Sequence, residues 1–182
     1  TLFERGVVKN VVQINIPQER SFMHIDTIFT HINQNHITAF KPIVVDGLSS
    51  NVEVHRANGT NTFYPSVKDF IRSEINPKMK FILSGDGESP YQEREQWTDG
   101  CNLVTLKPGV ALTYDRNPKT ELAFKDYGYN IMPARKFLED VKLGKIQTDT
   151  LENTIITLPS NELSRARGGS HCMTCPIERE DV

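Results

Sequence analysis

Two cysteines near the end of the chain are spaced as C-x-x-C, in the stretch "GGSHCMTCPIE" at residues 168–178. Cys172 directly follows a histidine, and Cys175 directly precedes a proline. A stretch of this kind suits three chemistries: a zinc knuckle, a thiol redox pair, or a single cysteine nucleophile. Each of them makes a different demand on the rest of the sequence.

The ligands for a zinc site are too few. Structural zinc takes four ligands, commonly from two C-x-x-C knuckles or from one knuckle and histidines. The sequence adds one distant cysteine, Cys101, and His171, whose adjacency to Cys172 is awkward for sharing a metal. A thioredoxin-like pair should open a helix that lowers the pKa of the thiol, but only "PIEREDV" follows. We therefore favour the nucleophile and expect neither a metal nor a cofactor.

A cysteine nucleophile needs a proton carrier and a group that holds the substrate. The stretch "MHID" offers both, because residues i and i+2 of a strand project from the same face and would place His24 beside Asp26. Cys172 follows a glycine pair that lets backbone and substrate approach closely. His24 and Asp26 are also compatible with a purely structural role, as a half-buried histidine and its hydrogen-bond partner.

Composition and charge limit the class of protein. The 182 residues suit one domain, and the net charge of −2 with interspersed signs gives no basic surface for nucleic acid or an anionic membrane. No apolar run reaches the roughly 18 to 20 residues of a membrane span. Three cysteines are too few for a disulfide framework, which favours a reducing compartment. We expect a cytoplasmic protein with neither a nucleic-acid nor a membrane partner.

Two stretches of the sequence read as similar units. Each contains a strand hairpin, a helix and a further strand, which predicts a structural repeat without sequence repetition. The stretch from 135 to 154 predicts a short helix and a solvated connector. The predicted strands are 7–17, 22–31, 36–45, 78–85, 102–106, 110–115, 129–133 and 154–159, and the predicted helices are 64–77, with Ser66 as cap, and 116–128, with Asn117 as cap.

Three stretches, in order and at their spacing, resemble the C-terminal portion of arginine deiminases. They are "FMHIDTIFT" (22–30), "REQWTDGCNLVTLKPGVALTYDRNP" (94–118) and "NELSRARGGSHCMTCPI" (161–177). The resemblance implies an α+β fold of the pentein type, an α/β propeller whose ββαβ modules circle a pseudo-fivefold axis around the site. Residues 1–182 would then be a single C-terminal portion of that catalytic propeller, a partial ring of two to three modules without the N-terminal ones.

The resemblance also implies a role for four residues. Cys172 would attack the guanidinium carbon of L-arginine, ammonia would leave, and water would release citrulline from a covalent thiouronium intermediate. His24 would protonate the leaving amine and then activate the water. Asp26 would hold the guanidinium through two parallel hydrogen bonds, and Arg167 would pair with the substrate carboxylate.

The sequence departs from this family in length. Arginine deiminases are about twice as long, and their earlier modules carry a glutamate in an "E-G-G-D"-like stretch, a second guanidinium-binding aspartate and further arginines. None of these precedes His24, and "SGDGESP" at 84–90 matches only superficially. A partial ring exposes strand edges. We therefore expect this chain to pack against a missing N-terminal half or a second copy, as a homo-oligomer, and to be weakly active or inactive alone.

The remaining residues of the motifs have structural interpretations. Cys101 and Cys175 are expected to be packing residues, and Trp97 a core anchor. Asp99 and Asn102 are expected to serve as turn and hydrogen-bond residues. Two other functions stay open: an amidinotransferase, in which an amine resolves the intermediate, and a non-catalytic partial propeller that binds a partner chain.

Overall fold

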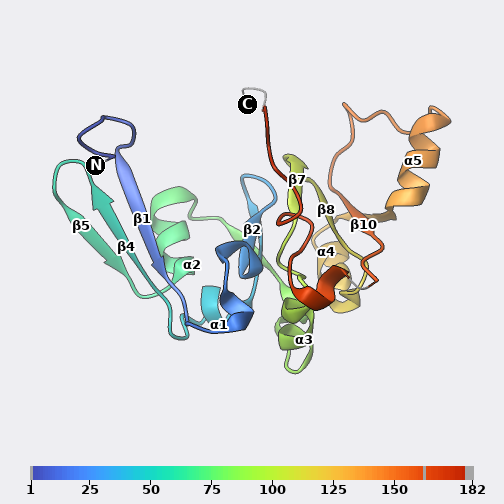
Figure 1. The fold of residues 1–182 in the computed structure, drawn as a ribbon. Helices are drawn as coiled ribbons and strands as arrows, with labels where there is room; N and C mark the ends of the chain where they lie inside the picture. The colour runs from blue at the N-terminus through green and yellow to red at the C-terminus, as the bar shows by residue number, and fades with distance from the viewer. Residues whose placement is uncertain (1, 162, 179–182) are drawn as a thin grey trace.

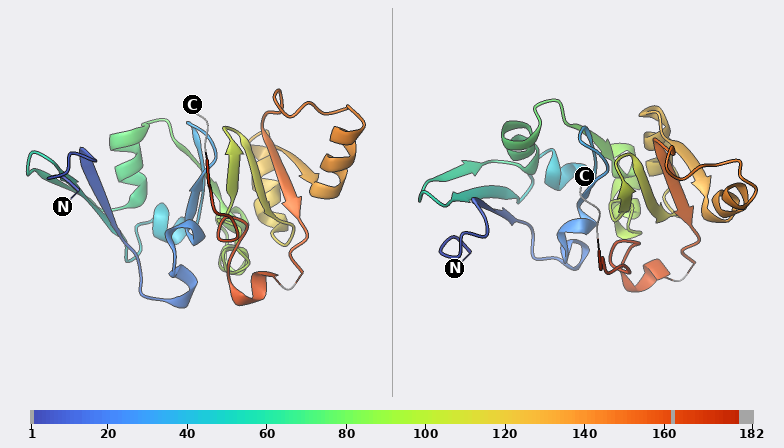
Figure 2. Two further views of the ribbon diagram at one scale, coloured as in Figure 1. Left: turned by 45° about the horizontal axis from the view of Figure 1, so that its top comes forward. Right: turned by 90° about the horizontal axis from the view of Figure 1, so that it is seen from above.

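The computed structural model describes residues 2–161 and 163–178 and contains three separate β-sheets with short helices (Figure 1). The sheets follow one another along the molecule, from the one with the N-terminal strand to the one beside helix α5 (Ala134–Lys142) (Figures 1 and 2). The C-terminal segment returns to the middle of the molecule. The expected α+β class is confirmed. No helix in the described ranges has the length and apolarity to cross a membrane.

An antiparallel sheet lies at one end. Its strands, in the order β1-β4-β5, are β1 (Asn10–Asn15), β4 (Asn51–Arg56) and β5 (Asn61–Tyr64). Strand β1 confirms the predicted strand at 7–17, but the β4–β5 hairpin was not predicted. Its signal is the dipeptide Asn58-Gly59, in which Gly59 takes a φ of +84° that favours glycine in such turns. The hairpin lies at the end of the molecule opposite helix α5 (Figure 1).

The middle sheet is mixed. Strands β2 (Phe29–His31) and β3 (His36–Ala39) run antiparallel, and β6 (Lys80–Leu83) lies parallel to β3. The predicted strands at 22–31 and 36–45 are thus correct only in their adjoining halves. Residues outside those halves form two 3₁₀ turns, η1 (Arg20–Phe22) and η2 (Ile25–Thr27), and helix α1 (Lys41–Val44).

Local chemistry explains both differences. Pro42 lies in the first turn of α1, a position that suits its fixed φ, and it has no N–H for a strand ladder. In η2, the Thr27 hydroxyl donates to the carbonyl of His24 at 2.6 Å. This local hydrogen bond turns the chain where the alternation of the sequence predicts extension. His24 itself keeps an extended backbone, with φ −137° and ψ 146°, so the strand reasoning holds there for one residue only.

The third sheet has the strand order β7-β8-β10-β9. Strands β7 and β8 are antiparallel, and β10 is parallel to both of its neighbours. The predicted return strand is therefore at the sheet edge, because β10 lies between it and β8. In both mixed sheets an antiparallel pair continues into a parallel third strand. The bounds are β7 (Val104–Lys107), β8 (Val110–Tyr114), β9 (Asn130–Pro133) and β10 (Thr154–Leu158).

The helices are short and fill the connections between strands. Ser66 caps α2 as predicted, since its hydroxyl accepts from the backbone N–H of Asp69 at 3.0 Å. Helix α5 is confirmed, and the connector after it is largely exposed. The other bounds are α2 (Val67–Phe70), the π-helix η3 (Ile71–Ile75), η4 (Ser84–Gly87), α3 (Tyr91–Trp97), α4 (Pro118–Asp126) and η5 (Leu163–Ala166).

Helix α4 is capped by a side chain from another helix. Asn117 occupies the predicted cap position, but its side chain makes no capping bond and contacts Thr98 instead. The buried carboxylate of Glu95 in α3 accepts from the backbone N–H of Lys119 at 3.0 Å and of Thr120 at 2.7 Å. It therefore satisfies two N–H groups that a helix start leaves without partners. This contact fixes α3 against α4.

Glu95→Ala is expected to lower the free energy of unfolding by about 2 kcal/mol, because it leaves buried N–H groups of α4 without an acceptor. Urea unfolding at neutral pH measures the change. Glu93→Ala, at an exposed position of the same helix, is the matched control and should change it by less than about 0.5 kcal/mol. Equal losses for the two variants would contradict the capping role.

Two apolar clusters form the core. One packs the middle sheet against the β1-β4-β5 sheet, with Ile37, Val54 and Phe70 among its buried members, and it includes Cys101 with no exposed surface. The other fills the space under the third sheet around Leu103 and Phe124. The burial of Cys101 confirms its predicted packing role. The two clusters support the two segments that meet at the candidate site.

Candidate functional site

The loop that carries Cys172 is attached to strand β8. Gly168 takes a φ of +125°, and its carbonyl accepts from the Tyr114 hydroxyl at 3.2 Å. The Ser170 hydroxyl donates to the carbonyl of Leu112 at 3.1 Å. These contacts hold the loop across the end of the third sheet. Cys172 is an exposed residue.

Asn102 lies beneath the loop and is fully buried. Its Oδ1 accepts from the backbone N–H of His171 at 2.9 Å, and its Nδ2 donates to Cys172 Sγ at 3.3 Å. Its backbone carbonyl accepts from the Ser170 hydroxyl at 3.0 Å and shares that hydrogen with the carbonyl of Leu112. Gly169 makes this approach possible, because a Cβ there would lie 2.2 Å from Asn102 Oδ1. Gly168 thus provides the backbone conformation of the loop, and Gly169 allows Asn102 to pack closely against it.

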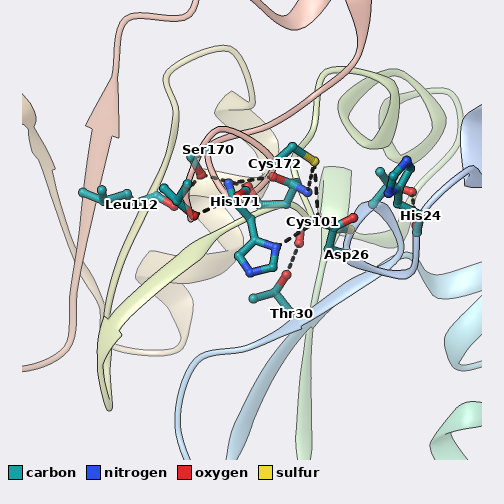
Figure 3. A network of polar contacts seen from close by, with 11 residues as sticks. His24, Asp26, Thr30, Cys101, Leu112, Ser170, His171 and Cys172 are labelled. Atoms are coloured by element: carbon teal, nitrogen blue, oxygen red, sulfur yellow. Dashed lines mark hydrogen bonds and ion pairs between the residues drawn. The ribbon is translucent and has the colours of Figure 1, made fainter. Parts of the chain in front are cut away.

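The segment that carries His24 and Asp26 comes from the other side of the site. Its Ser21 carbonyl accepts from Gln96 Nε2 at 2.8 Å, and Gln96 also donates to the carbonyl of Thr27 at 3.1 Å. Helix α3 therefore holds both ends of this segment. Asp26 lies inside the segment and faces the Cys172 loop (Figure 3).

Two side chains contact one carboxylate oxygen of Asp26. Asp26 Oδ2 accepts from Cys172 Sγ at 3.4 Å and lies 2.9 Å from His171 Nδ1 (Figure 3). Asp26 and Cys172 are 146 positions apart in the sequence. His24 lies beyond Asp26 as seen from the His171 ring in Figure 3, and it is exposed. The fold therefore brings Cys172 and Asp26 into contact, and His24 lies two residues from Asp26 in the chain.

The electrostatics of this contact keep the thiol protonated. Burial raises the pKa of Cys172 above its usual 9.0, and the charge of Asp26 and its acceptance of the thiol hydrogen raise it further. Hydrogen bonds from Gly169 and Asn102 act in the opposite direction. Burial also raises the pKa of Asp26, but hydrogen bonds from His171, Cys172 and Asn102 outweigh it and hold the pKa below 3.8. At neutral pH the site thus holds a thiol beside a carboxylate.

Arg167 is mostly buried and directs its guanidinium toward backbone carbonyls. Nη1 donates to Gln96 at 3.2 Å and to Trp97 at 2.5 Å, and Nη2 donates to Ser21 at 2.7 Å. The guanidinium also lies 4.7 Å from the centre of the Trp97 ring. In this arrangement Arg167 connects the Cys172 loop with α3 and with the segment that carries Asp26. The predicted pairing with a substrate carboxylate stays a prediction.

Asp99 is a second buried carboxylate near the site. It has no exposed surface, and no side chain in the described residues donates a hydrogen bond to either of its oxygens. Burial raises its pKa to about 6, the charge of Arg167 and the backbone N–H of Gly168 lower it, and the charge of Asp26 raises it. Its φ of +65° confirms the predicted turn. Asp99 is thus the charged group with the largest effect on the pKa of Arg167.

Two structural interpretations of the sequence are wrong. Cys175 is exposed rather than packed in the core. Trp97 is 43% exposed and faces Arg167, so it is no core anchor.

Sequence reasoning missed two contacts of the site. Asn102 was assigned a general hydrogen-bonding role, and His171 was considered only as a metal ligand. The available signal was Gly169, since a second glycine beside a nucleophile indicates close approach by another group. The sequence does not say which group approaches. Within the described residues, no cluster of three or more histidine, cysteine, aspartate or glutamate side chains is arranged to hold a metal ion.

Comparison with known proteins identifies the relatives of the chain. A family model described as arginine deiminase matches residues 1–179. An arginine deiminase of Limosilactobacillus reuteri is 32% identical over 187 aligned positions, which cover 100% of this chain and 40% of the relative. Arginine deiminases of Pediococcus pentosaceus and Limosilactobacillus fermentum are 31% and 32% identical, again over 100% of this chain and 40% of the relative. The chain spans less than half the length of these curated relatives.

Proposed function

The chain belongs to the arginine deiminase family, and we propose that it carries the cysteine-bearing part of a site that hydrolyses L-arginine to L-citrulline and ammonia. The observation that supports this most directly is the contact between an exposed thiol and a carboxylate, 3.4 Å from Cys172 Sγ to Asp26 Oδ2. A carboxylate beside a nucleophile is suited to a cationic substrate, because it can hold a guanidinium through paired hydrogen bonds.

Substrate binding would activate the thiol. In the free protein the Asp26 carboxylate raises the pKa of Cys172. A guanidinium bound to Asp26 neutralises that carboxylate and places a positive charge next to the sulfur, and both changes lower the pKa of the thiol. The nucleophile is then formed where its substrate is present.

The covalent steps follow from the same groups. The Cys172 thiolate forms a bond to the guanidinium carbon, and the bond from that carbon to one terminal nitrogen breaks. His24 gives a proton to the departing nitrogen, which leaves as ammonia. The S-alkylthiouronium that remains is attacked by a water molecule, whose proton His24 takes. The carbon–sulfur bond breaks, citrulline leaves, and the thiol is regenerated.

Arg167 would bind the substrate carboxylate with those guanidinium N–H groups that do not already donate to backbone carbonyls. Its Nη1 and one Nη2 hydrogen already meet carbonyls, whereas Nε has no partner in the described part of the chain. The edge formed by Nε and the second Nη2 hydrogen fits a carboxylate with two parallel bonds. A small displacement of the loop would be needed to expose that edge.

Recognition of arginine is incomplete in this chain. One carboxylate at the guanidinium leaves part of its charge uncompensated once water is excluded, which is costly. We propose that an N-terminal half or a second copy supplies a second carboxylate and further donors, and that the two mixed sheets are modules of a propeller completed in that way. The shared strand pattern of these sheets supports this proposal.

The decisive experiment uses an amidine-bearing alkylating agent, 2-chloroacetamidine, with 2-chloroacetamide as its neutral counterpart. We expect chloroacetamidine to label Cys172 at least tenfold faster than Cys175, and excess L-arginine to slow that labelling. Chloroacetamide should show no such preference, because a carboxylate attracts only the cation. Peptide mass spectrometry assigns the labelled residue, and citrulline is assayed in parallel.

The outcomes separate the possible functions. Equal labelling of both exposed cysteines by a folded sample would contradict an amidine site and would support a non-catalytic relative. Ornithine together with a new guanidino compound, formed when an amine is added, would identify an amidinotransferase. Robust citrulline formation by a monomer would contradict the proposed need for a second part.

A further inference from the structure

The side-chain amide of Asn102 has only one orientation that the surrounding hydrogen bonds permit. The backbone N–H of His171 is a donor and lies 2.9 Å from one end of the amide, so that end is the oxygen. The other end, Nδ2, must therefore be the group 3.3 Å from Cys172 Sγ. The sulfur is thus an acceptor in this contact. A donor directed at a nucleophilic sulfur stabilises negative charge on it.

The position of this donor is fixed by its surroundings. Asn102 is fully buried, and its carbonyl is held by the Ser170 hydroxyl at 3.0 Å. Gly169 provides the space, since any Cβ at that position would overlap the amide. The donor from Asn102 is therefore in place at the sulfur before any substrate arrives.

We propose that Asn102 is a catalytic residue, whose buried amide donates a hydrogen bond that stabilises the Cys172 thiolate during attack and during its release from the intermediate. This inference rests on the proposed role of Cys172 as nucleophile. In the free protein the thiol donates to Asp26 and accepts from Asn102. When a guanidinium occupies Asp26, the thiol proton leaves by way of that carboxylate or to solvent. The Asn102 contact remains for the anion.

Other charged groups face the sulfur and must be kept constant in a test. Asp26 and His171 lie at the site, and the charge of Cys172 also interacts with Arg167 and with Tyr114. A variant of Asn102 alters none of these charges if it introduces no charge of its own. Asn102→Ala meets that condition, whereas aspartate would not.

The test is the pH dependence of alkylation by iodoacetamide in Asn102→Ala and wild type, followed for each cysteine by peptide mass spectrometry. No turnover is needed, so the result does not depend on whether the chain forms citrulline. We expect the midpoint for Cys172 to rise by about one pH unit, which slows alkylation about tenfold at pH 8. Cys175 is an exposed internal reference, and its rate should be unchanged.

A purely structural role for Asn102 predicts the opposite sign. Loosening the loop would move the thiol away from Asp26 and out into solvent, and so would weaken the two influences that raise its pKa, burial and the Asp26 carboxylate. The midpoint for Cys172 would then fall toward 9.0. A lower or unchanged midpoint therefore refutes the proposal. Thr174→Ala, which removes the hydrogen bond from the Thr174 hydroxyl to the carbonyl of His171 without touching Asn102 or the sulfur, should change the midpoint by less than about 0.3 units.

A measurement on the unmutated residue decides the question if Asn102→Ala does not fold. The side-chain NH₂ resonances of Asn102 should shift with pH at the same midpoint as Cys172 alkylation, because the hydrogen bond strengthens when the sulfur becomes an anion. In Cys172→Ser that titration should disappear. Resonances that do not respond to ionisation of Cys172 would overturn the assignment.

Discussion

Asp26→Asn should make the Cys172 thiol more acidic and remove its preference for cationic reagents. The Asp26 carboxylate raises the pKa of the thiol both by its charge and by accepting the thiol hydrogen. A neutral amide removes the charge, so the pKa falls and more thiolate is present at a given pH. We expect iodoacetamide to alkylate Cys172 about tenfold faster at pH 7.5, which corresponds to about one pKa unit.

The same substitution should weaken every reaction that depends on a bound guanidinium or amidine. Losing a charge-assisted contact to a cation costs about 1.5–3 kcal/mol, so chloroacetamidine should lose about 10- to 100-fold of its advantage over chloroacetamide. Asp46→Asn makes the same charge change at an exposed position outside the site and should leave both rates unaltered. A parallel fall of both reagents would indicate a displaced loop and would refute the proposed contact of Asp26 with cations.

Asp26 and Asn102, the two neighbours of the sulfur, shift the pKa of the Cys172 thiol in opposite directions. Asp26 stabilises the neutral thiol, whereas Asn102 stabilises the anion. Their variants should therefore move the alkylation midpoint of Cys172 in opposite directions, down for Asp26→Asn and up for Asn102→Ala. Such a pair of results cannot come from general loosening of the site, which would act in one direction.

The sequence predicted the regular elements well where local rules dominate. The β-branched runs predicted β1 and β10, a mainly apolar run predicted β6, and the capping signal of Ser66 predicted the start of α2. It failed where a local or distant side chain overrides the pattern. The Thr27 hydroxyl turns a stretch whose alternation predicts a strand, and Glu95 takes over the capping that Asn117 was expected to provide.

The site was predictable in its chemistry and only partly in its construction. The reason given for pairing His24 with Asp26, a shared strand face, is wrong because η2 begins between them. That Asp26 meets Cys172 followed from resemblance to a family, since nothing in the spacing relates positions 146 apart. Asn102 could not be placed at all, because its role depends on which backbone atoms the loop presents to it. Contacts of this kind arise from tertiary structure alone.

Gly169→Ala is expected to disrupt the site more than any other single methyl group added to this loop. Its Cβ would lie 2.2 Å from Oδ1, 2.5 Å from Cγ and 2.6 Å from Cβ of Asn102, which is held in place by backbone contacts and cannot yield easily. Overpacking of this kind costs about 1–3 kcal/mol. Either Asn102 loses its bond to Cys172 or the loop moves away from Asp26.

Both ways of relieving that overlap separate the sulfur from one of its two partners. Chloroacetamidine labelling of Cys172 in Gly169→Ala should therefore fall at least tenfold, while Cys175 reacts as before. Gly128→Ala is the matched control: its Cβ meets nothing within 4 Å, and its φ of +85° costs about 1 kcal/mol of stability without touching the site. If Gly169→Ala kept full labelling with a stability equal to that control, Asn102 would not be packed against the loop as the structure has it, and its assignment as the thiolate donor would fail with it.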